Sequence, residues 1–161
     1  MALRLVARGL VRSAACSRSR PALSSASTAP DGISLDMYHA VSARTLDAVF
    51  ETLEDMADSM PDAQIDVECA ADVLNLGVGE RAFVLNKQAP NLQLWLSSPV
   101  RGPLRYDFDS ASARWINNRD AHPMLPALAS DIRELCGEDP GFEKVEEDIA
   151  SFYRKRATGQ Q

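Results

Sequence analysis

The chain has few cysteines, and they are not spaced for any cysteine-based site. Its 161 residues include three, Cys16, Cys69 and Cys136. Three cysteines are too few for a disulfide framework, and none has the CxxC or Cys/His spacing that binds zinc or a metal cluster. We therefore interpret Cys69 and Cys136 as packed thiols of a protein in a reduced compartment.

The sequence also lacks long hydrophobic runs and the common catalytic motifs. Charged residues, proline or serine interrupt every apolar stretch before it reaches the roughly 18 residues of a membrane-spanning helix. There is no glycine-rich phosphate loop, and the two histidines, His39 and His122, have no motif around them. We expect neither a membrane partner nor a catalytic residue of a nucleophilic enzyme.

Acidic residues are missing from the first 30 positions, which contain five arginines and six serines before Asp31. Leucines and valines between the arginines would give a helix one basic stripe and one apolar side. This composition is typical of a mitochondrial transit peptide, so residues 1–30 are predicted to be one and the protein to reside in the mitochondrial matrix. A basic arm that binds nucleic acid is the alternative.

The remainder, residues 31–161, is strongly acidic. It contains 12 Lys and Arg against 23 Asp and Glu, a formal charge of −11. A surface that binds phosphates needs a basic patch, so we expect no nucleic acid partner and expect cations or basic protein surfaces instead. We predict one domain in this segment, with a core at about 35–137 and a C-terminal extension at 138–161.

Apolar residues recur with a helical period in three segments. The first runs from 35 to 60 and ends at Pro61. The second follows His122 and ends at Gly137, and the third, shorter helix is predicted after Gly141, near the C-terminus. Basic residues at 154–156 would favour the end of this third helix through its dipole.

Short β-rich runs separated by turn residues fill the region between the first two helices. The predicted strands are 64–69, 72–77, 81–86, 92–97, 102–108 and 113–116. Hairpin-length connections indicate an antiparallel sheet. The order of elements predicts an α+β fold, a two-layer sandwich in which two helices cover one face of a five- to six-stranded antiparallel sheet. Its other face would be open to solvent or a partner.

Carboxylates follow one side of the first predicted helix and continue onto the first strand. Five of them fall within an arc of about 100° opposite the apolar stripe, at 100° per residue. The set, which we call the acidic ridge, is Asp47, Glu51, Glu54, Asp55, Asp58, Asp62 and Asp66. Such hard oxygen ligands hold Fe²⁺, Mn²⁺ or Ca²⁺ weakly on an open surface. A merely solvated face is the alternative, although like-charge crowding without paired lysines costs stability.

A second candidate surface lies on the predicted strands. Three leucines in the segment 92–96 alternate with Gln93 and Trp95, so the tryptophan faces away from them. The same alternation places Arg105 on the Trp95 side. An exposed Trp with Arg, Gln and the turn at 86–88 has the composition of a protein-binding hot spot. The alternative is that the C-terminal segment covers this Trp.

Several motifs resemble the frataxin family. They are NKQAPN at 86–91, QLWLSSP at 93–99, GPLRYD at 102–107, LEDMAD at 53–58 and Tyr38. The resemblance runs from about Leu35 to Leu135. It departs from the family pattern at His39, Ala43 and Arg44, where relatives are often acidic, and Arg44 projects onto the acidic ridge. No part of 141–161 matches.

The resemblance implies a function in iron–sulfur cluster assembly. Frataxins bind the complex of cysteine desulfurase and scaffold protein, promote sulfur transfer, and bind iron (Fe²⁺ or Fe³⁺) weakly on the ridge. Residues matching the family's partner-binding surface are Asn86, Lys87, Gln88, Gln93, Trp95 and Arg105. We expect a monomer, with iron-dependent oligomers as a further state. The alternative is a ferroxidase that oxidises Fe²⁺ on the ridge and stores it.

Overall fold

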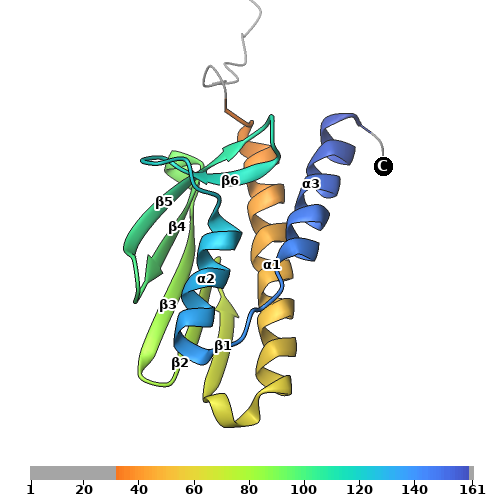
Figure 1. The fold of residues 1–161 in the computed structure, drawn as a ribbon. Coiled ribbons are helices and arrows are strands. Elements are labelled where there is room, and N and C mark those ends of the chain that lie inside the picture. The colour runs from red at the N-terminus through yellow and green to blue at the C-terminus, as the bar shows by residue number, and fades with distance from the viewer. Residues whose placement is uncertain (1–31, 160–161) are drawn as a thin grey trace, which may run out of the picture.

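The computed structural model describes residues 32–159 as three helices and one sheet (Figure 1). The helices are α1 (Leu35–Ser59), α2 (Met124–Cys136) and α3 (Glu143–Ala157), with short 3₁₀ turns η1 (Pro61–Ala63) and η2 (Ala89–Asn91). The strands are β1 (Ile65–Ala70), β2 (Val73–Val78), β3 (Arg81–Gln88), β4 (Gln93–Ser98), β5 (Gly102–Asp109) and β6 (Arg114–Asn117). The predicted transit peptide at 1–30 lies outside the described residues.

The sheet confirms the predicted antiparallel architecture. Its six strands stand in sequence order, β1 to β6, and every neighbouring pair is antiparallel. All six strands begin within one residue of their predicted start. The largest difference is at the end of β3, which continues to Gln88 rather than stopping at 86.

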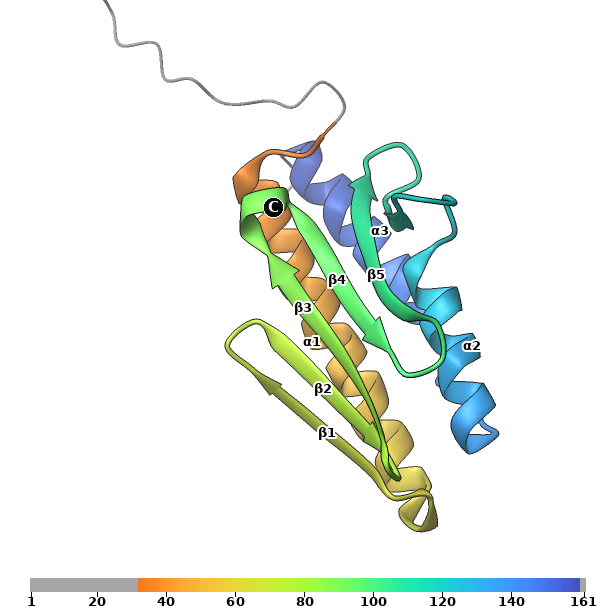
Figure 2. The ribbon, with the colours of Figure 1, turned by 90° about the vertical axis from the view of Figure 1, so that its left-hand side faces the viewer.

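The helices all lie on one side of this sheet, so the molecule has two layers (Figures 1 and 2). Ser34 caps the N-terminus of α1, because its Oγ accepts a hydrogen bond from the Met37 amide at 3.2 Å. Its apolar side is buried against the strands, as is the side of α2 that carries Leu128 and Ile132. No helix within 32–159 is long and apolar enough to cross a membrane.

The predicted third helix exists and belongs to the helix layer. Val145 and Ile149 of α3 are buried, and the Arg44 Nε atom of α1 lies 2.6 Å from Asp148 Oδ2. Tyr153 packs its ring against Phe108, with 5.0 Å between ring centroids. Because α3 packs on the helix side, it does not cover the opposite sheet face.

The two cysteines of the described residues differ in their relation to the hydrophobic core. Core residues of the described part run from Ile33 to Ile149, so residues 32–159 contain a complete hydrophobic core. The prediction that Cys69 is packed is wrong, because β1 is an edge strand and Cys69 is exposed there. Cys136 is half-buried and its thiol donates to the Ile132 carbonyl at 3.2 Å, as expected of a packed thiol.

Candidate functional site

Three of the predicted partner-binding residues stand side by side across the sheet. Asn86 of β3 is directly opposite Trp95 of β4, which is directly opposite Arg105 of β5. The alternate residues Leu94 and Leu96 are buried beneath the helices. Strand alternation therefore puts the three side chains on the open face of the sheet.

Trp95 is held in place by its neighbours. The Arg105 guanidinium carbon lies 4.5 Å from the centre of the Trp95 ring, which is cation–π geometry. The indole Nε1–H donates to Gln93 Oε1 at 2.9 Å, and Gln93 Nε2 in turn donates to Asp107 Oδ1 at 2.9 Å. The four side chains thus form a connected chain that fixes the orientation of the half-buried tryptophan.

Asp107 is a member of this chain that the motif-based prediction omitted. It lies two residues after Arg105 on β5 and pairs with Gln93 in the strand register. The alternation that placed Arg105 on the open face places Asp107 there as well. We define the docking face as Asn86, Gln88, Gln93, Trp95, Arg105 and Asp107.

Lys87, in contrast, lies on the other side of the sheet. It pairs with Leu94, and its side chain is only 8% exposed. Its Nζ atom is 2.7 Å from Asp72 Oδ1, and its amide donates to the Asp72 carbonyl at 3.1 Å. Lys87 therefore ties β3 to the turn between β1 and β2 and does not join the docking face.

The strand that carries Trp95 is also anchored from the helix layer. The Tyr38 hydroxyl of α1 donates to the Gln93 carbonyl at 2.9 Å, and Tyr38 is completely buried. Burial raises the pKa of Tyr38 from its ordinary value of 10.0 to about 12, so the hydroxyl stays protonated, and able to donate, at a more alkaline pH than a free tyrosine. Gln93 thus links the core to Trp95, because its backbone carbonyl accepts from Tyr38 and its side chain accepts from the Trp95 indole.

The carboxylates of the acidic ridge are exposed on α1, η1 and β1, and part of the ridge lines a groove between α1 and β1. We call this lining the acidic groove, and its carboxylates belong to Glu51, Glu54, Asp55, Asp58 and Asp66. Asp47 is exposed one turn upstream on α1, and Asp62 is exposed in η1. None of the seven ridge carboxylates forms an ion pair with another residue of 32–159.

The upstream end of the ridge is modified by α3. Arg44, which the helical count places on the ridge, bonds to Asp148 rather than to a ridge carboxylate. Asp148 is the largest cause of a raised Arg44 pKa, and Glu51 and Asp47 contribute smaller shifts. The free carboxylates therefore concentrate on the second half of α1.

The groove carboxylates do not form an enclosed metal site among the described residues. Within residues 32–159, no three His, Cys, Asp or Glu side chains converge closely enough to hold one. One or two groove carboxylates can instead coordinate a single hard cation, and water molecules complete its coordination.

Comparison with known proteins bears on both surfaces. A sequence model of the frataxin-like domain matches residues 31–138, which include the docking face and the acidic ridge. The chain belongs to the frataxin family. The match ends just after α2, so the third helix lies outside the family domain.

Two similar proteins illustrate the range of the frataxin match. The mitochondrial frataxin of Dictyostelium discoideum is 36% identical over 106 residues, covering 65% of this chain and 55% of that protein. The mitochondrial frataxin homolog of Schizosaccharomyces pombe is 36% identical over 111 residues, covering 68% and 70%. The chain thus spans little more than half of the first relative and about two thirds of the second.

Solved frataxin structures share the fold. A trimeric Saccharomyces cerevisiae frataxin, described as complexed with ferrous ion, superposes with a TM-score of 0.55 at 29% identity, covering 61% of this chain and 87% of that one. A frataxin from Psychromonas ingrahamii superposes with a TM-score of 0.50 at 19% identity, which supports the fold alone. The two-layer frataxin sandwich is therefore established for this chain.

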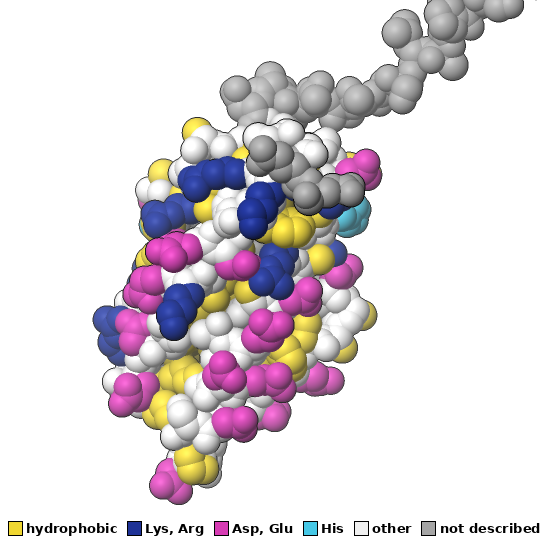
Figure 3. Space-filling view, turned by 90° about the vertical axis from the view of Figure 1, so that its right-hand side faces the viewer, with side chains coloured by type: hydrophobic (Ala, Val, Ile, Leu, Met, Phe, Trp, Pro, Cys, Tyr) yellow, Lys and Arg dark blue, Asp and Glu magenta, His cyan; other side chains and the backbone are white. Residues whose placement is uncertain are grey.

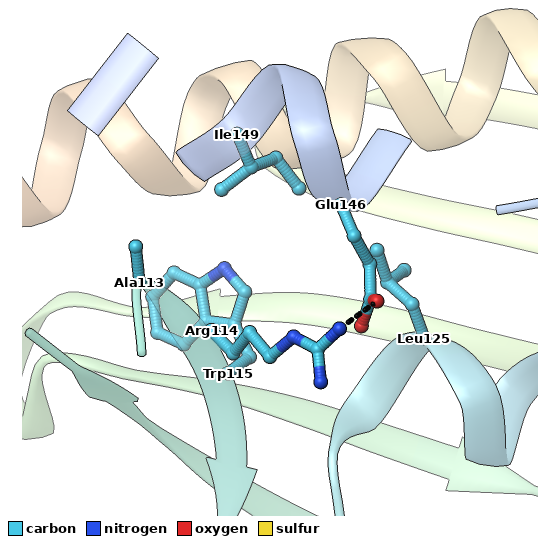
Figure 4. A pocket seen from close by; sticks show the side chains of 6 residues that line it. All are labelled: Ala113, Arg114, Trp115, Leu125, Glu146 and Ile149. Atoms are coloured by element: carbon cyan, nitrogen blue, oxygen red, sulfur yellow. Dashed lines mark hydrogen bonds and ion pairs between the residues drawn. The ribbon is translucent and has the colours of Figure 1, made fainter. Parts of the chain in front are cut away.

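A small cavity beneath α3 is not a ligand site (Figure 4). It holds about 10 Å³ between β6, α2 and α3, at the lower limit for one water molecule. Arg114 Nη2 and Glu146 Oε2 form an ion pair at 2.6 Å along its wall, beside the Trp115 ring. This corner joins α3 to the frataxin core.

Proposed function

We propose that this frataxin-family protein is a mitochondrial matrix regulator of iron–sulfur cluster assembly. Its docking face binds the complex of cysteine desulfurase and scaffold protein and promotes sulfur transfer, while its acidic ridge binds Fe²⁺ weakly and delivers it. Nucleic acid is not a partner in this proposal.

The observation that carries the proposal is the ordered environment of Trp95. A Trp ring stacked by Arg105 and oriented by Gln93 presents a rigid aromatic and a cation together, which is the composition of interface hot spots. Pre-organisation lowers the entropy lost on binding. An open sheet face with these side chains is suited to a protein surface rather than to a small molecule, which needs a concave pocket.

The iron role is supported by the carboxylates of the acidic groove and by the ferrous complex of the yeast relative. Because the groove is open and holds no converged ligand set within the described residues, binding is weak and the bound ion exchanges readily. That property suits delivery of iron to a second site better than storage.

The experiment follows sulfide production and cluster formation by the desulfurase and scaffold complex, with and without this protein. Trp95→Ala should abolish the acceleration while leaving the fold intact, because Trp95 is outside the helix-covered core. Asn75→Ala is the matched control, since Asn75 is exposed on the same sheet face on β2, away from Trp95. An unchanged rate with Trp95→Ala would rule out docking through this face.

A ferroxidase is the second candidate, favoured by the concentration of five carboxylates in one groove. Oxidation of Fe²⁺ by O₂ on this surface would be measured as oxygen uptake. The candidate predicts a rate above that of free Fe²⁺ that falls in an Asp47→Asn, Glu51→Gln variant. A rate equal to free iron, or one unaffected by these substitutions, eliminates it.

A further inference from the structure

The end of α3 is a basic region on an otherwise acidic domain. Arg154, Lys155 and Arg156 are exposed in its last turn. None of them forms an ion pair with another residue in the described range 32–159. We call these three residues the basic end. They lie outside the segment 31–138 that matches the frataxin-like domain.

The basic end and the acidic groove lie at opposite ends of the helix layer. Helix α3 runs antiparallel to α1, so its last turn is beside the start of α1 (Figure 1). The face that carries α3 has Lys and Arg side chains toward that end, and only Asp and Glu among its charged side chains toward the other (Figure 3). The surface is therefore electrically polarised along α1.

The separation is too large for the two regions to neutralise each other within one molecule. Arg44 of α1 is level with Asp148 of α3, because the two side chains are bonded. From there α1 rises about 10 Å to Glu51 and about 21 Å to Asp58, and α3 rises about 9 Å the other way to Arg154, at 1.5 Å per residue. The two regions are therefore separated by about two to three times the Debye length of roughly 10 Å at 0.1 M salt.

We propose that copies of this chain associate head to tail, with the basic end of one copy seated in the acidic groove of the next. Three unpaired cations would meet five unpaired carboxylates, in a groove between α1 and β1 that is open to solvent. Because two different patches meet, the interface is heterologous and propagates into a ring or a chain. The docking face is on the other side of the sheet and remains free.

Another copy fits the basic end better than an anionic membrane does. Membrane-binding clusters contain about four to eight Lys and Arg, whereas this one has three on a segment with a formal charge of −11. Phe152 and Tyr153 are half-buried, so no fully exposed aromatic adjoins the basic end to enter a bilayer. Exposed charge pairs are individually weak, so we expect a dissociation constant on the order of 0.1–1 mM.

Sedimentation equilibrium at up to millimolar protein tests the proposal, with residues 31–161 and the full chain run side by side. Association should occur near 0.1 M NaCl and weaken about tenfold or more by 0.5 M, because screening acts on exposed charges. The basic-end variant, Lys155→Glu with Arg156→Glu, should also associate about tenfold more weakly. Circular dichroism checks that α3 persists, since these cations also favour its C-terminus.

A mixing experiment separates a specific interface from a change in net charge. The groove variant, Glu54→Lys with Asp58→Lys, should be monomeric alone, as should the basic-end variant, but the two mixed should associate through complementary surfaces. The matched control, Arg81→Glu with Arg119→Glu, has the charge of the basic-end variant at exposed positions elsewhere. It should self-associate like the unsubstituted protein, within about twofold.

Three results would overturn the proposal. One is an unsubstituted protein that remains monomeric at all salt concentrations, including the case in which it binds anionic lipid vesicles through the basic end. Another is a basic-end variant that associates as strongly as the control. The third is a mixture of the two variants that remains monomeric.

Discussion

The docking face and the acidic groove are built on opposite principles. On the docking face, Trp95, Gln93, Arg105 and Asp107 bond to or stack on one another, so each side chain has a partner before any protein binds. In the acidic groove, five carboxylates of one sign have no ion-pair partner within the described part of the chain. The first surface is organised by geometry and the second by charge.

This difference determines how each surface should respond to change. A connected set of side chains loses its function when one member is removed, because the others lose their orientation. Independent charges contribute separately and are screened by salt. Substitutions on the docking face should therefore act on partner binding, and substitutions in the groove should act through electrostatics.

Among the further substitutions that test this contrast, Arg105→Glu should have the largest effect. It removes the cation stacked on Trp95 and places a carboxylate two residues from Asp107, so we expect binding to the desulfurase complex to fall about 100-fold, within the range of interface hot spots. Arg81→Glu, an identical charge change at an exposed position on β3, should change it less than about twofold. Surface plasmon resonance on the immobilised complex measures both. Equal losses would mean that net charge, not the geometry around Trp95, controls docking.

Alkaline pH tests the anchor beneath the docking face. The Tyr38 pKa is about 12 in the folded protein against 10.0 for the free side chain, chiefly because of burial. Unfolding therefore releases a proton above pH 10, so this contribution to stability is complete below pH 10 and is lost as the pH rises toward 12. By pH 11 the loss from Tyr38 should be about 1.4 kcal/mol.

Urea unfolding at pH 9, 10 and 11 measures this loss. Tyr38→Phe is the control, because phenylalanine cannot ionise. The free energy of unfolding of this variant should depend less steeply on pH, by the one proton that Tyr38 releases on unfolding. The Tyr106 pKa is also raised by burial and leaves a residual slope. An identical slope in Tyr38→Phe would show that Tyr38 is not the titrating anchor.

A smaller effect is expected from Asp107→Ala, which removes the acceptor of the Gln93 amide. Asp107 is exposed, so global stability should change by less than about 0.5 kcal/mol. Trp95 should lose its fixed orientation, and activation of the desulfurase should fall about three- to fivefold at limiting protein concentration. The Trp95 indole N–H resonance should broaden while that of buried Trp115 does not. A sharp, unshifted Trp95 resonance would exclude this positioning role.

Simple alternation and helical periodicity predicted most of these features. The alternation of leucines in 92–96, of which Leu94 and Leu96 are buried, was sufficient to place Trp95 on the open face. The five ridge carboxylates of α1 are exposed on the side that the helical count indicated. The sequence did not reveal the inward orientation of Lys87, because the predicted third strand stopped at 86. Strand β3 continues to Gln88, and alternation turns Lys87 toward the helices. A turn boundary shifted by two residues is enough to reverse a side chain.

The third helix shows a different limit of sequence reasoning. Its period and its end at a basic triplet were readable from 142 to 156, but its position was not. That position depends on single long-range contacts, Arg44 with Asp148 and Phe108 with Tyr153. No local pattern encodes pairings between residues 104 and 45 positions apart, so the polarised surface emerges only in the folded structure.

The smallest effect concerns the acidic groove and gives the opposite sign from the docking face. Glu54 and Asp58 stand at i and i+4 on α1, as do Glu51 and Asp55. Such like-charge pairs destabilise a helix by about 0.2–0.5 kcal/mol each. Glu54→Gln should therefore stabilise the protein by a few tenths of a kcal/mol in dilute buffer, and the gain should vanish near 1 M NaCl, where the Debye length is about 3 Å.

Thermal unfolding at low and high salt measures this gain, with Glu80→Gln as the control at an exposed hairpin position beside Arg81. The control should give no stabilisation, because Glu80 is not on a helix and has a cationic neighbour. A stabilisation by Glu54→Gln that persists at high salt would have to arise from helix propensity or packing. The groove would then be an ordinary solvated surface, and the contrast with the docking face would lose its electrostatic basis.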